Sequence, residues 1–330
     1  VPIRQQAELP GRILHRLGHP VDRGMPARRH GPFRSYAYLK ISEGCNNRCA
    51  FCTIPSIRGR LQSRPIQEVL REAGHLIEQG AGELVLVSQD STAYGRDLGY
   101  RSGLADLAEQ LVGLSGLLRL RIMYLYPSGL DEGLMARLAE LGPPFVPYFD
   151  VPLQHAHPEI LKKMGRPFQH DPVEVIGRIR NYFPGAAIRS TLITGYPGEE
   201  EEHFQAILEF VRRAGVQHLG VFPFYPEEGT RAADFAGQVP DELKKERRGL
   251  IMQEQKRISR EYLQGFQGES MDILVDAPHP EWPGLYTGRT WFQAPEADGL
   301  TYISGPGVGP GKMVRAEITA SHDYDLEALA

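Results

Sequence analysis

The three cysteines of this 330-residue chain, Cys45, Cys49 and Cys52, fall within one short segment, and the chain contains no others. Iron–sulfur clusters are usually held by four cysteine thiolates. Three closely spaced thiolates can hold three corners of a [4Fe–4S] cluster. Because the chain has no fourth cysteine to offer, one iron would remain open to another molecule. The spacing therefore predicts an open-iron cluster held by a single loop.

The residues alone also allow other uses of clustered cysteines. A zinc site with a His or Asp as its fourth ligand is one alternative. Zinc cysteines usually come as two C-x2-C pairs, however, and no second pair exists here. Buried structural cysteines are common, but chance would scatter them along the chain. A disulfide would leave one thiol unpaired. The spacing favours the cluster.

The length predicts about two domains. The longest apolar runs, such as Leu84–Val87, have the length of a strand, far short of the ~20 residues that span a bilayer. We therefore expect no membrane association. The N-terminus shows no signal-peptide pattern, and clustered cysteines without others fit a reducing compartment. These features predict a cytoplasmic protein, which we expect to be a monomer.

The charge of the chain is unevenly distributed. From Gln264 to the end, ten acidic residues oppose three basic ones, a net charge of −7 in a chain whose total is −4. An acidic domain suits a phosphate backbone poorly, because nucleic-acid binding relies on Lys and Arg. It suits a basic partner better, although it could also be only a solvated face. Nucleic acid is therefore not expected as the direct substrate.

The pattern along the chain predicts three parts: a basic connector over residues 1–34, a larger domain over 35–263 and a small domain over 264–330. In the larger domain, predicted strands alternate with helices, which indicates a parallel sheet curled into a partial (β/α)6 barrel. The strands are Ala37–Ile41, Leu84–Val87, Leu118–Leu125, Tyr148–Leu153, Ala187–Ile193 and Gln217–Phe222. The helices are Ile66–Gln79, Gly103–Leu114, Leu130–Leu141, His157–Met164, Pro172–Phe183 and Glu200–Ala214.

The end of the chain has a different pattern. A long charged helix over Pro240–Leu263 carries a narrow apolar stripe of Leu243, Leu250, Ile251 and Ile258. Short β segments punctuated by Gly and Pro follow, which predicts a small all-β barrel of OB-like size. These segments are Met271–Val275, Leu285–Phe292, Thr301–Ile303 and Met313–Thr319.

Polar motifs follow the predicted strands where each strand ends. They are the cysteine loop, Ser88–Gly95, Gln154-His155 and Thr194–Glu199. Active sites of barrel enzymes gather at the carboxyl ends of the strands, so this convergence predicts the site. Each motif also has a structural interpretation: Thr194–Glu199 as a turn, and His155 as a hydrogen-bonded core residue. Arg189 falls within a buried strand and therefore needs a partner or a ligand carboxylate.

These motifs carry a family resemblance. The cysteine loop with its neighbours (Glu43–Pro55, Arg58-Gly59 and Ser63–Pro65), Leu192–Glu199 and the C-terminal barrel resemble the radical S-adenosylmethionine (SAM) methylthiotransferases with a TRAM domain. Ser88–Gly95 and the ending His322–Leu326 are similar to the RimO branch of that family. The tRNA-modifying branch carries a different, Asn-rich segment in place of Ser88–Gly95. The resemblance covers about residue 35 to the end.

The resemblance implies an activity and its cofactors. One SAM would supply the methyl group, and another would be cleaved by a reduced cluster to give a 5′-deoxyadenosyl radical. The product would be a methylthio group on the β-carbon of an aspartate in the twelfth protein of the small ribosomal subunit. An electron donor of flavodoxin or ferredoxin type is expected. Because the small domain is acidic, the alternative of a tRNA adenosine methylthiotransferase is less favoured. A non-catalytic ribosome-docking iron–sulfur protein is the further alternative.

Residue roles also come from the resemblance. Cys45, Cys49 and Cys52 are implied as cluster ligands, with Phe51 between two of them as a shield. Candidates for SAM contacts are Gln89, Gln154, Arg189, Thr194, Gly195, Pro197 and Gly198. Candidates for positioning the substrate are Asp90 and Tyr94.

The family also has an N-terminal domain with three more cysteines, which bind a second [4Fe–4S] cluster that carries the sulfur. The resemblance implies that this domain is missing here and that residues 1–34 are its leftover linker. We therefore expect this chain to cleave SAM without inserting sulfur.

Overall fold

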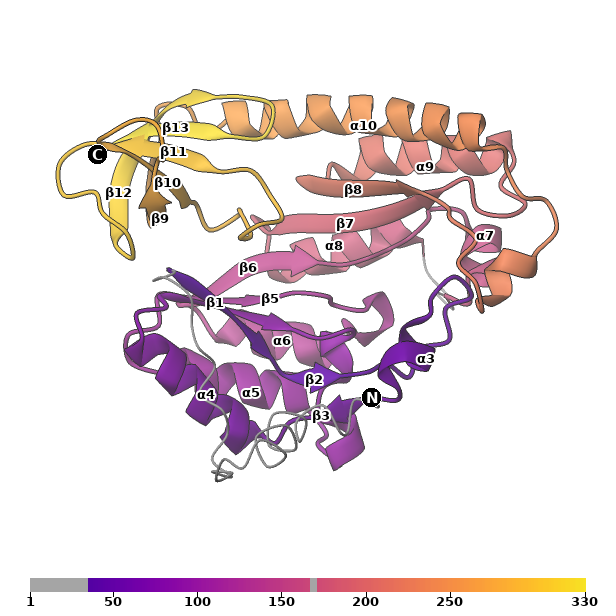
Figure 1. Cartoon of the computed structure of the whole chain (residues 1–330), viewed down its shortest axis with the longest axis horizontal. Coiled ribbons are helices and arrows are strands. Elements are labelled where there is room, and N and C mark those ends of the chain that lie inside the picture. Colours follow the sequence, from indigo (N-terminus) through magenta and orange to yellow (C-terminus); the bar gives the residue numbers. More distant parts are fainter. Residues whose placement is uncertain (1–34, 167–170) are drawn as a thin grey trace, which may run out of the picture. The chain divides into compact units, whose positions relative to one another are not determined.

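One parallel sheet forms the larger part of the protein. The computed structural model describes residues 35–166 and 171–330, so the connector predicted over residues 1–34 lies outside it. Six strands lie in chain order, and every neighbouring pair is parallel (Figure 1). They are β1 (Tyr36–Lys40), β4 (Glu83–Val87), β5 (Arg119–Ile122), β6 (Phe145–Asp150), β7 (Ala187–Thr194) and β8 (His218–Pro223). The predicted parallel (β/α)6 architecture is confirmed.

Helices cover one face of this sheet. Alternate strand residues, such as Leu39, Leu84 and Leu120, are buried against them in one large core. The helices are α4 (Ile66–Glu78), α5 (Gly103–Val112), α6 (Glu132–Glu140), α7 (Pro158–Lys163), α8 (Pro172–Tyr182) and α9 (Glu201–Ala214). Right-handed crossovers between parallel strands place connecting helices on the same side. The other set of alternate residues forms an inner face that includes Arg121, Tyr148 and Arg189.

Two strands end three residues before their predicted ends. The strand predicted over Leu118–Leu125 covers only Arg119–Ile122, because the backbone leaves the extended region at Tyr124, where φ is 59°. The strand predicted over Tyr148–Leu153 covers Phe145–Asp150. Pro152 has no N–H to donate to the ladder, and Gln154 has a φ of 76°. Both departures occur at the carboxyl end of the sheet.

Three short elements near the cysteine loop were not predicted. The strands β2 (Ser42–Glu43) and β3 (Gln62–Ser63) pair in antiparallel fashion on either side of the loop. The helix α3 (Ile54–Arg58) lies between them in the chain. Because β2 and β3 pair, the two ends of the segment that contains the cysteines lie side by side, just after β1.

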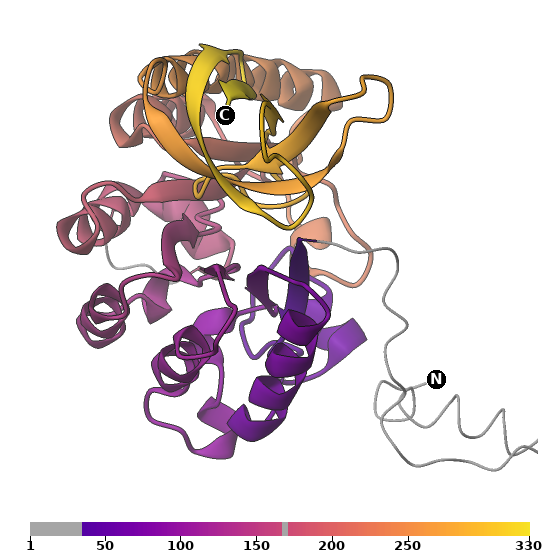
Figure 2. The ribbon, with the colours of Figure 1, turned by 90° about the vertical axis from the view of Figure 1, so that its left-hand side faces the viewer.

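The predicted small β-barrel is also confirmed. Five strands close in the order β10-β11-β13-β12-β9 (Figure 2). They are β9 (Ser270–Pro278), β10 (Leu285–Arg289), β11 (Thr301–Ser304), β12 (Met313–Ser321) and β13 (Leu326–Leu329), of which β13 was not predicted. The segment predicted over Leu285–Phe292 stops at Arg289, because the Gln293 side chain accepts from the Thr290 N–H (3.0 Å) and turns the chain.

The long helix α10 (Asp241–Gln264) packs differently from the predicted apolar stripe. Leu250 is 43 % exposed, and the buried face includes Lys244, Arg247 and Gln255 beside Ile251. The Gln255 amide donates to the Val216 carbonyl at 3.0 Å. Ile251 is nevertheless buried in the main core and Ile258 packs against it, so the predicted stripe is confirmed in part and polar contacts supplement it. Within residues 35–166 and 171–330, no helix combines the length and apolar character that crossing a bilayer requires.

A buried charge network joins the small barrel to the amino ends of the parallel strands. Glu83, the first residue of β4, accepts from Arg121 at 2.7 Å and from Arg289 of β10 at 2.5 Å. Arg289 also pairs with Asp276 of β9 at 2.8 Å. Burial by itself would raise the pKa of Glu83, but Arg121 and Arg289 lower that pKa to about 2. The carboxylate is therefore ionised in the folded protein at neutral pH.

Apolar packing accompanies these ion pairs. Val85 and Tyr148 of the inner face belong to one core cluster with Ile273 and Phe292 of the small barrel. The small barrel therefore fills the inner face of the sheet at its amino end, opposite the end at which the cysteine loop begins.

Arg289→Ala should lower the free energy of unfolding by about 3–5 kcal/mol, because it leaves buried carboxylates without a partner. Urea unfolding followed by circular dichroism measures this loss. Arg315→Ala is the matched control: its ion pair with Asp272 (3.4 Å) is exposed, so the change should stay below about 1 kcal/mol. Equal losses in the two variants would contradict a special role for the buried network.

Candidate active site

The three cysteine side chains surround one cavity at the carboxyl end of the sheet. All three are free thiols and half-buried. The loops that follow β4, β5 and β6 supply much of the remaining lining. The full set is Cys45, Asn47, Cys49, Phe51, Cys52, Ile54, Gln89, Tyr124, Tyr126, Pro152, Gln154 and Arg166. The polar motifs after the first, second and fourth predicted strands therefore meet at this cavity, as their positions at strand ends predicted.

Backbone contacts fix the cysteine loop at both of its ends. Gly44 has a φ of +78°, and a Cβ there would lie 2.3 Å from the Arg60 carbonyl oxygen, so the position requires glycine. The Cys45 N–H donates to the Gly59 carbonyl at 3.1 Å. Further along, the Ala50 N–H donates to the Met164 carbonyl at 2.7 Å. The loop is therefore held at its start by its own return segment and at its end by the chain after α7.

A side-chain contact anchors the middle of the loop. The Asn47 amide donates to one carboxylate oxygen of Asp90 at 2.8 Å, and the Thr92 hydroxyl donates to the other at 2.6 Å. Asp90, which the sequence suggested for positioning the substrate, thus ties the loop after β4 to the cysteine loop.

Burial raises the pKa of the Cys45 thiol, partly offset by hydrogen bonds from Asn47. Burial also raises the pKa of the Cys52 thiol, and the Arg166 guanidinium acts in the opposite direction. Both groups therefore hold their protons at neutral pH in the metal-free chain. Because iron and zinc bind thiolate, metal binding here would release protons.

Of the residues suggested for SAM contacts, Gln89 and Gln154 line the cavity, as does Phe51, the suggested shield of the cluster. The Gln89 Oε1 is buried and accepts no hydrogen bond within the described part of the chain. Gln154 and Tyr124 both hold positive φ angles, which are rare for residues other than glycine. Strained backbone of this kind often accompanies ligand sites.

The Thr194–Glu199 segment forms a structural turn. The Glu199 carboxylate accepts from the Gly195 N–H at 2.8 Å and from Arg247 at 2.7 Å. The same carboxylate faces the buried His155 ring at 3.3 Å, so His155 is a hydrogen-bonded core residue. The structure does not bring Thr194, Gly195, Pro197 or Gly198 to the lining of the cysteine cavity.

Arg189 and Tyr94 also lie away from the cavity. Arg189 is the third residue of β7 and donates to Asp298 of the small barrel at 2.6 Å, so its required partner is a carboxylate of the protein. Tyr94 is 1 % exposed, and its hydroxyl donates to the Arg64 carbonyl at 2.7 Å. Both side chains are committed to internal contacts, because β7 carries Arg189 near its amino end and a 3₁₀ turn directs Tyr94 into the core.

Comparison with known proteins decides the family. Residues 39–211 match the model of the radical SAM superfamily, and residues 268–330 match that of the TRAM domain. The chain is 56 % identical over 296 residues to the ribosomal protein uS12 methylthiotransferase RimO of Oleidesulfovibrio alaskensis, covering 90 % of this chain and 69 % of that protein. This chain belongs to the RimO family.

A second RimO protein, from Lawsonia intracellularis, is 52 % identical, with 90 % of this chain and 68 % of that protein covered. Among solved structures, the chain is similar to the radical SAM methyltransferase TsrM of Kitasatospora setae. The TM-score is 0.48 and the identity 18 %, over 76 % of this chain and 42 % of that one. Membership in the RimO family makes this chain a radical SAM methylthiotransferase, an enzyme that transfers a group.

Sequence reasoning missed several residues that line the cavity of this RimO-family chain, among them Tyr124, Tyr126 and Arg166. Tyr124 and Tyr126 follow β5, but the sequence pattern predicts a strand that continues to Leu125, so it does not place Tyr124 at a strand end. Arg166 follows α7, where no strand end signals a site. Its Nη1 lies 3.7 Å from Cys49 Sγ, a contact between residues far apart in the sequence that no local pattern reveals.

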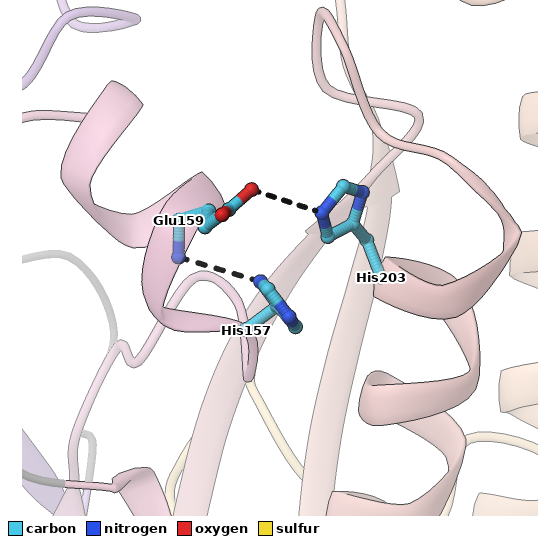
Figure 3. Close-up of side chains that lie close together, drawn as sticks. All are labelled: His157, Glu159 and His203. Carbon is cyan, nitrogen blue, oxygen red and sulfur yellow. Dashed lines mark hydrogen bonds and ion pairs between the residues drawn. The ribbon is translucent and has the colours of Figure 1, made fainter.

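A second group of polar side chains lies between α7 and α9. His157, Glu159 and His203 bring ligand-type atoms within 4.8 Å of one another (Figure 3). The His203 Nδ1 accepts from the Glu200 N–H at 2.9 Å, and the His157 Nδ1 accepts from the Glu159 N–H at 3.3 Å. A neutral imidazole with an accepting Nδ1 carries its proton on Nε2. For the His203 Nε2 to ligate a metal, this proton would have to move to Nδ1, at the cost of the hydrogen bond from the Glu200 N–H.

Asp150 connects the inner face to the cavity. Its carboxylate accepts from the Tyr124 N–H at 3.1 Å and lies 3.9 Å from the Arg189 guanidinium. Burial raises the pKa of Asp150 from its ordinary value of 3.8 to about 6, although Arg189 acts in the opposite direction. The side chain thus holds Tyr124, which lines the cavity, in its unusual backbone conformation.

Asp150→Asn should change how stability depends on pH. Because the folded protein disfavours the ionised carboxylate, the contribution of Asp150 to the stability of the wild-type chain falls as the pH rises from about 4 to 6. The variant lacks this titration. From pH 4 to pH 7, the free energy of unfolding of the variant should therefore rise relative to wild type by up to about 3 kcal/mol. Urea unfolding at several pH values measures the difference. A constant difference would mean that Asp150 ionises normally in the folded state.

Proposed function

We propose that this chain binds a [4Fe–4S] cluster through Cys45, Cys49 and Cys52 and binds SAM in the adjoining cavity. We further propose that the reaction served is the addition of a methylthio group to the β-carbon of an aspartate in ribosomal protein uS12, and that this chain by itself cleaves SAM but does not insert the sulfur. The observation that carries the proposal is the gathering of three free thiols around one cavity at the carboxyl end of the sheet. The relatives are named as ribosomal protein uS12 methylthiotransferases, which supports uS12 as the substrate.

The residues at the cavity fit both cofactors. Three thiols without a fourth protein cysteine match a cluster with one open iron, because iron–sulfur clusters take thiolate ligands. The Gln89 Oε1, buried and without a donor in the described part of the chain, offers an acceptor for a donor group of SAM. The cavity also presents aromatic faces at Phe51, Tyr124 and Tyr126.

Cys45, Cys49 and Cys52 would hold the cluster, which would supply the one electron needed to cleave SAM into methionine and a 5′-deoxyadenosyl radical. The protein positions the cysteine loop and SAM and excludes water from the cavity. The Asn47–Asp90 contact holds the cysteine loop in place, while Gln89 and Gln154 orient SAM. Phe51 and Tyr126 cover the site, which keeps the radical from side reactions.

The remaining assignments are part of the same proposal. The electron donor is a flavodoxin or ferredoxin, and the chain acts as a monomer in the cytoplasm. Residues 35–263 form the catalytic domain, and residues 264–330 form the TRAM domain. The acidic surplus of the TRAM domain supports a basic protein partner, and membership in the RimO family favours uS12 over a tRNA adenosine.

Anaerobic reconstitution with iron and sulfide should give about four irons per chain. After reduction, the EPR spectrum should change on addition of SAM, and 5′-deoxyadenosine should accumulate. Cys49→Ala should lose the cluster and the nucleoside while keeping its far-UV circular dichroism. Nucleoside formation by Cys49→Ala, or a cluster insensitive to SAM, would contradict the proposed site.

The substrate assignment can be tested by binding. Fluorescence anisotropy should show that labelled uS12 binds this chain and that rising salt weakens the complex, as expected for opposite charges. Unmodified tRNA should bind less tightly at the same salt concentration. Tighter binding of tRNA, with a steep dependence on salt, would instead favour the tRNA adenosine alternative.

A further inference from the structure

Arg166 places a fixed positive charge beside one of the cysteines. It is 4 % exposed, and its Nη1 lies 3.7 Å from Cys49 Sγ. Its Nη2 donates to the Pro152 carbonyl, and its guanidinium lies over the Tyr126 ring, 4.3 Å from the ring centre. A sulfur, a carbonyl and an aromatic face thus hold the guanidinium in one position.

The surroundings keep this charge effective. Arginine stays protonated in proteins. Burial raises the pKa of Tyr126 to about 12, so the ring beneath the guanidinium stays neutral at physiological pH. Because water is largely excluded from the guanidinium, its field on the nearby sulfur is screened less than that of an exposed charge.

Other cations near the cysteine loop are engaged differently. Lys40 pairs with Glu43 at 2.6 Å, and Arg58 lies 3.7 Å from the same carboxylate. Arg231 donates to the backbone carbonyl of Arg48 at 2.8 Å. Among the described residues, Arg166 is the cation with a hydrogen bond to a cysteine sulfur.

We propose that Arg166 raises the reduction potential of the [4Fe–4S] cluster held by Cys45, Cys49 and Cys52, an inference that rests on the proposed cluster site. Reduction takes one electron from the flavodoxin- or ferredoxin-type donor and adds one negative charge to the cluster and its thiolates. A buried cation stabilises that added charge, and hydrogen bonds to cluster sulfurs shift the potential in the same direction.

The effect reaches both electron transfers of the enzyme. A higher potential makes it easier for the cluster to accept the electron from the donor. It also lessens the driving force for passing that electron on to the SAM sulfonium. Arg166 thus acts as a positioning and tuning residue, through the charge it holds beside Cys49, and sets the balance between loading the electron and using it.

The test is a potentiometric titration of the reconstituted chain, followed by the EPR signal of the reduced cluster, in the absence of SAM. The variants are Arg166→Gln and Arg166→Lys, with Arg231→Gln as the matched control. The midpoint of Arg166→Gln should shift to lower potential than that of wild type. Arg166→Lys keeps the charge, but lysine cannot make all three contacts. Its midpoint should therefore lie between those of Arg166→Gln and wild type. Arg231→Gln should titrate as wild type does.

Iron content and circular dichroism, measured on the same samples, separate the possible failures. A wild-type midpoint in Arg166→Gln with a full cluster would overturn the role of Arg166. If Arg166→Gln does not hold the cluster, Arg166→Lys decides, and an unshifted midpoint there would overturn the proposal. A wild-type chain that assembles no cluster would instead refute the proposed function itself.

Discussion

A parallel sheet places the carboxyl ends of all its strands at one edge, and the organisation of this protein depends on that constraint. The loops after β1, β4, β5 and β6 bring Cys45, Gln89, Tyr124 and Gln154 to a single cavity. The amino ends must be closed by other means, because the inner face carries buried charge there. The small barrel closes them with Arg289, whose guanidinium neutralises Glu83. One end of the sheet is therefore filled, and the other is left for ligands.

The buried arginines show how differently the two ends are used. At the amino end, Arg121, Arg189 and Arg289 are paired with carboxylates, which makes their charges part of the packing. At the carboxyl end, Arg166 directs its guanidinium at a cysteine sulfur. A cation beside a sulfur affects electron transfer when that sulfur ligates a centre that gains or loses charge, because the cation stabilises the more negative state. The same residue type thus serves structure in one place and, under the proposed cluster site, would tune electron transfer in the other.

Much of the site could be predicted because strand ends and loop motifs are local features. Gln89 and Gln154 directly follow predicted strands, and both line the cavity. Arg189 does not, because it lies five residues before the end of β7, roughly 16 Å from the edge where the cavity forms. The Thr194–Glu199 segment lies at the end of a strand, yet it forms a turn in which the Glu199 carboxylate accepts from the Gly195 N–H and from Arg247. Position after a strand therefore does not by itself place a residue at this site.

The sequence by itself determined the three-thiol loop, the alternation of strands and helices, and the small β-barrel with its acidic surplus. Each of these follows from short-range spacing or from composition, which the chain carries in any conformation. Only the tertiary structure decided that Asp298 is the partner of Arg189, that Glu83 meets Arg289, and that Arg166 lies beside Cys49. Those contacts join residues far apart in the chain. They depend on strand register and on the docking of the barrel, which no local periodicity encodes.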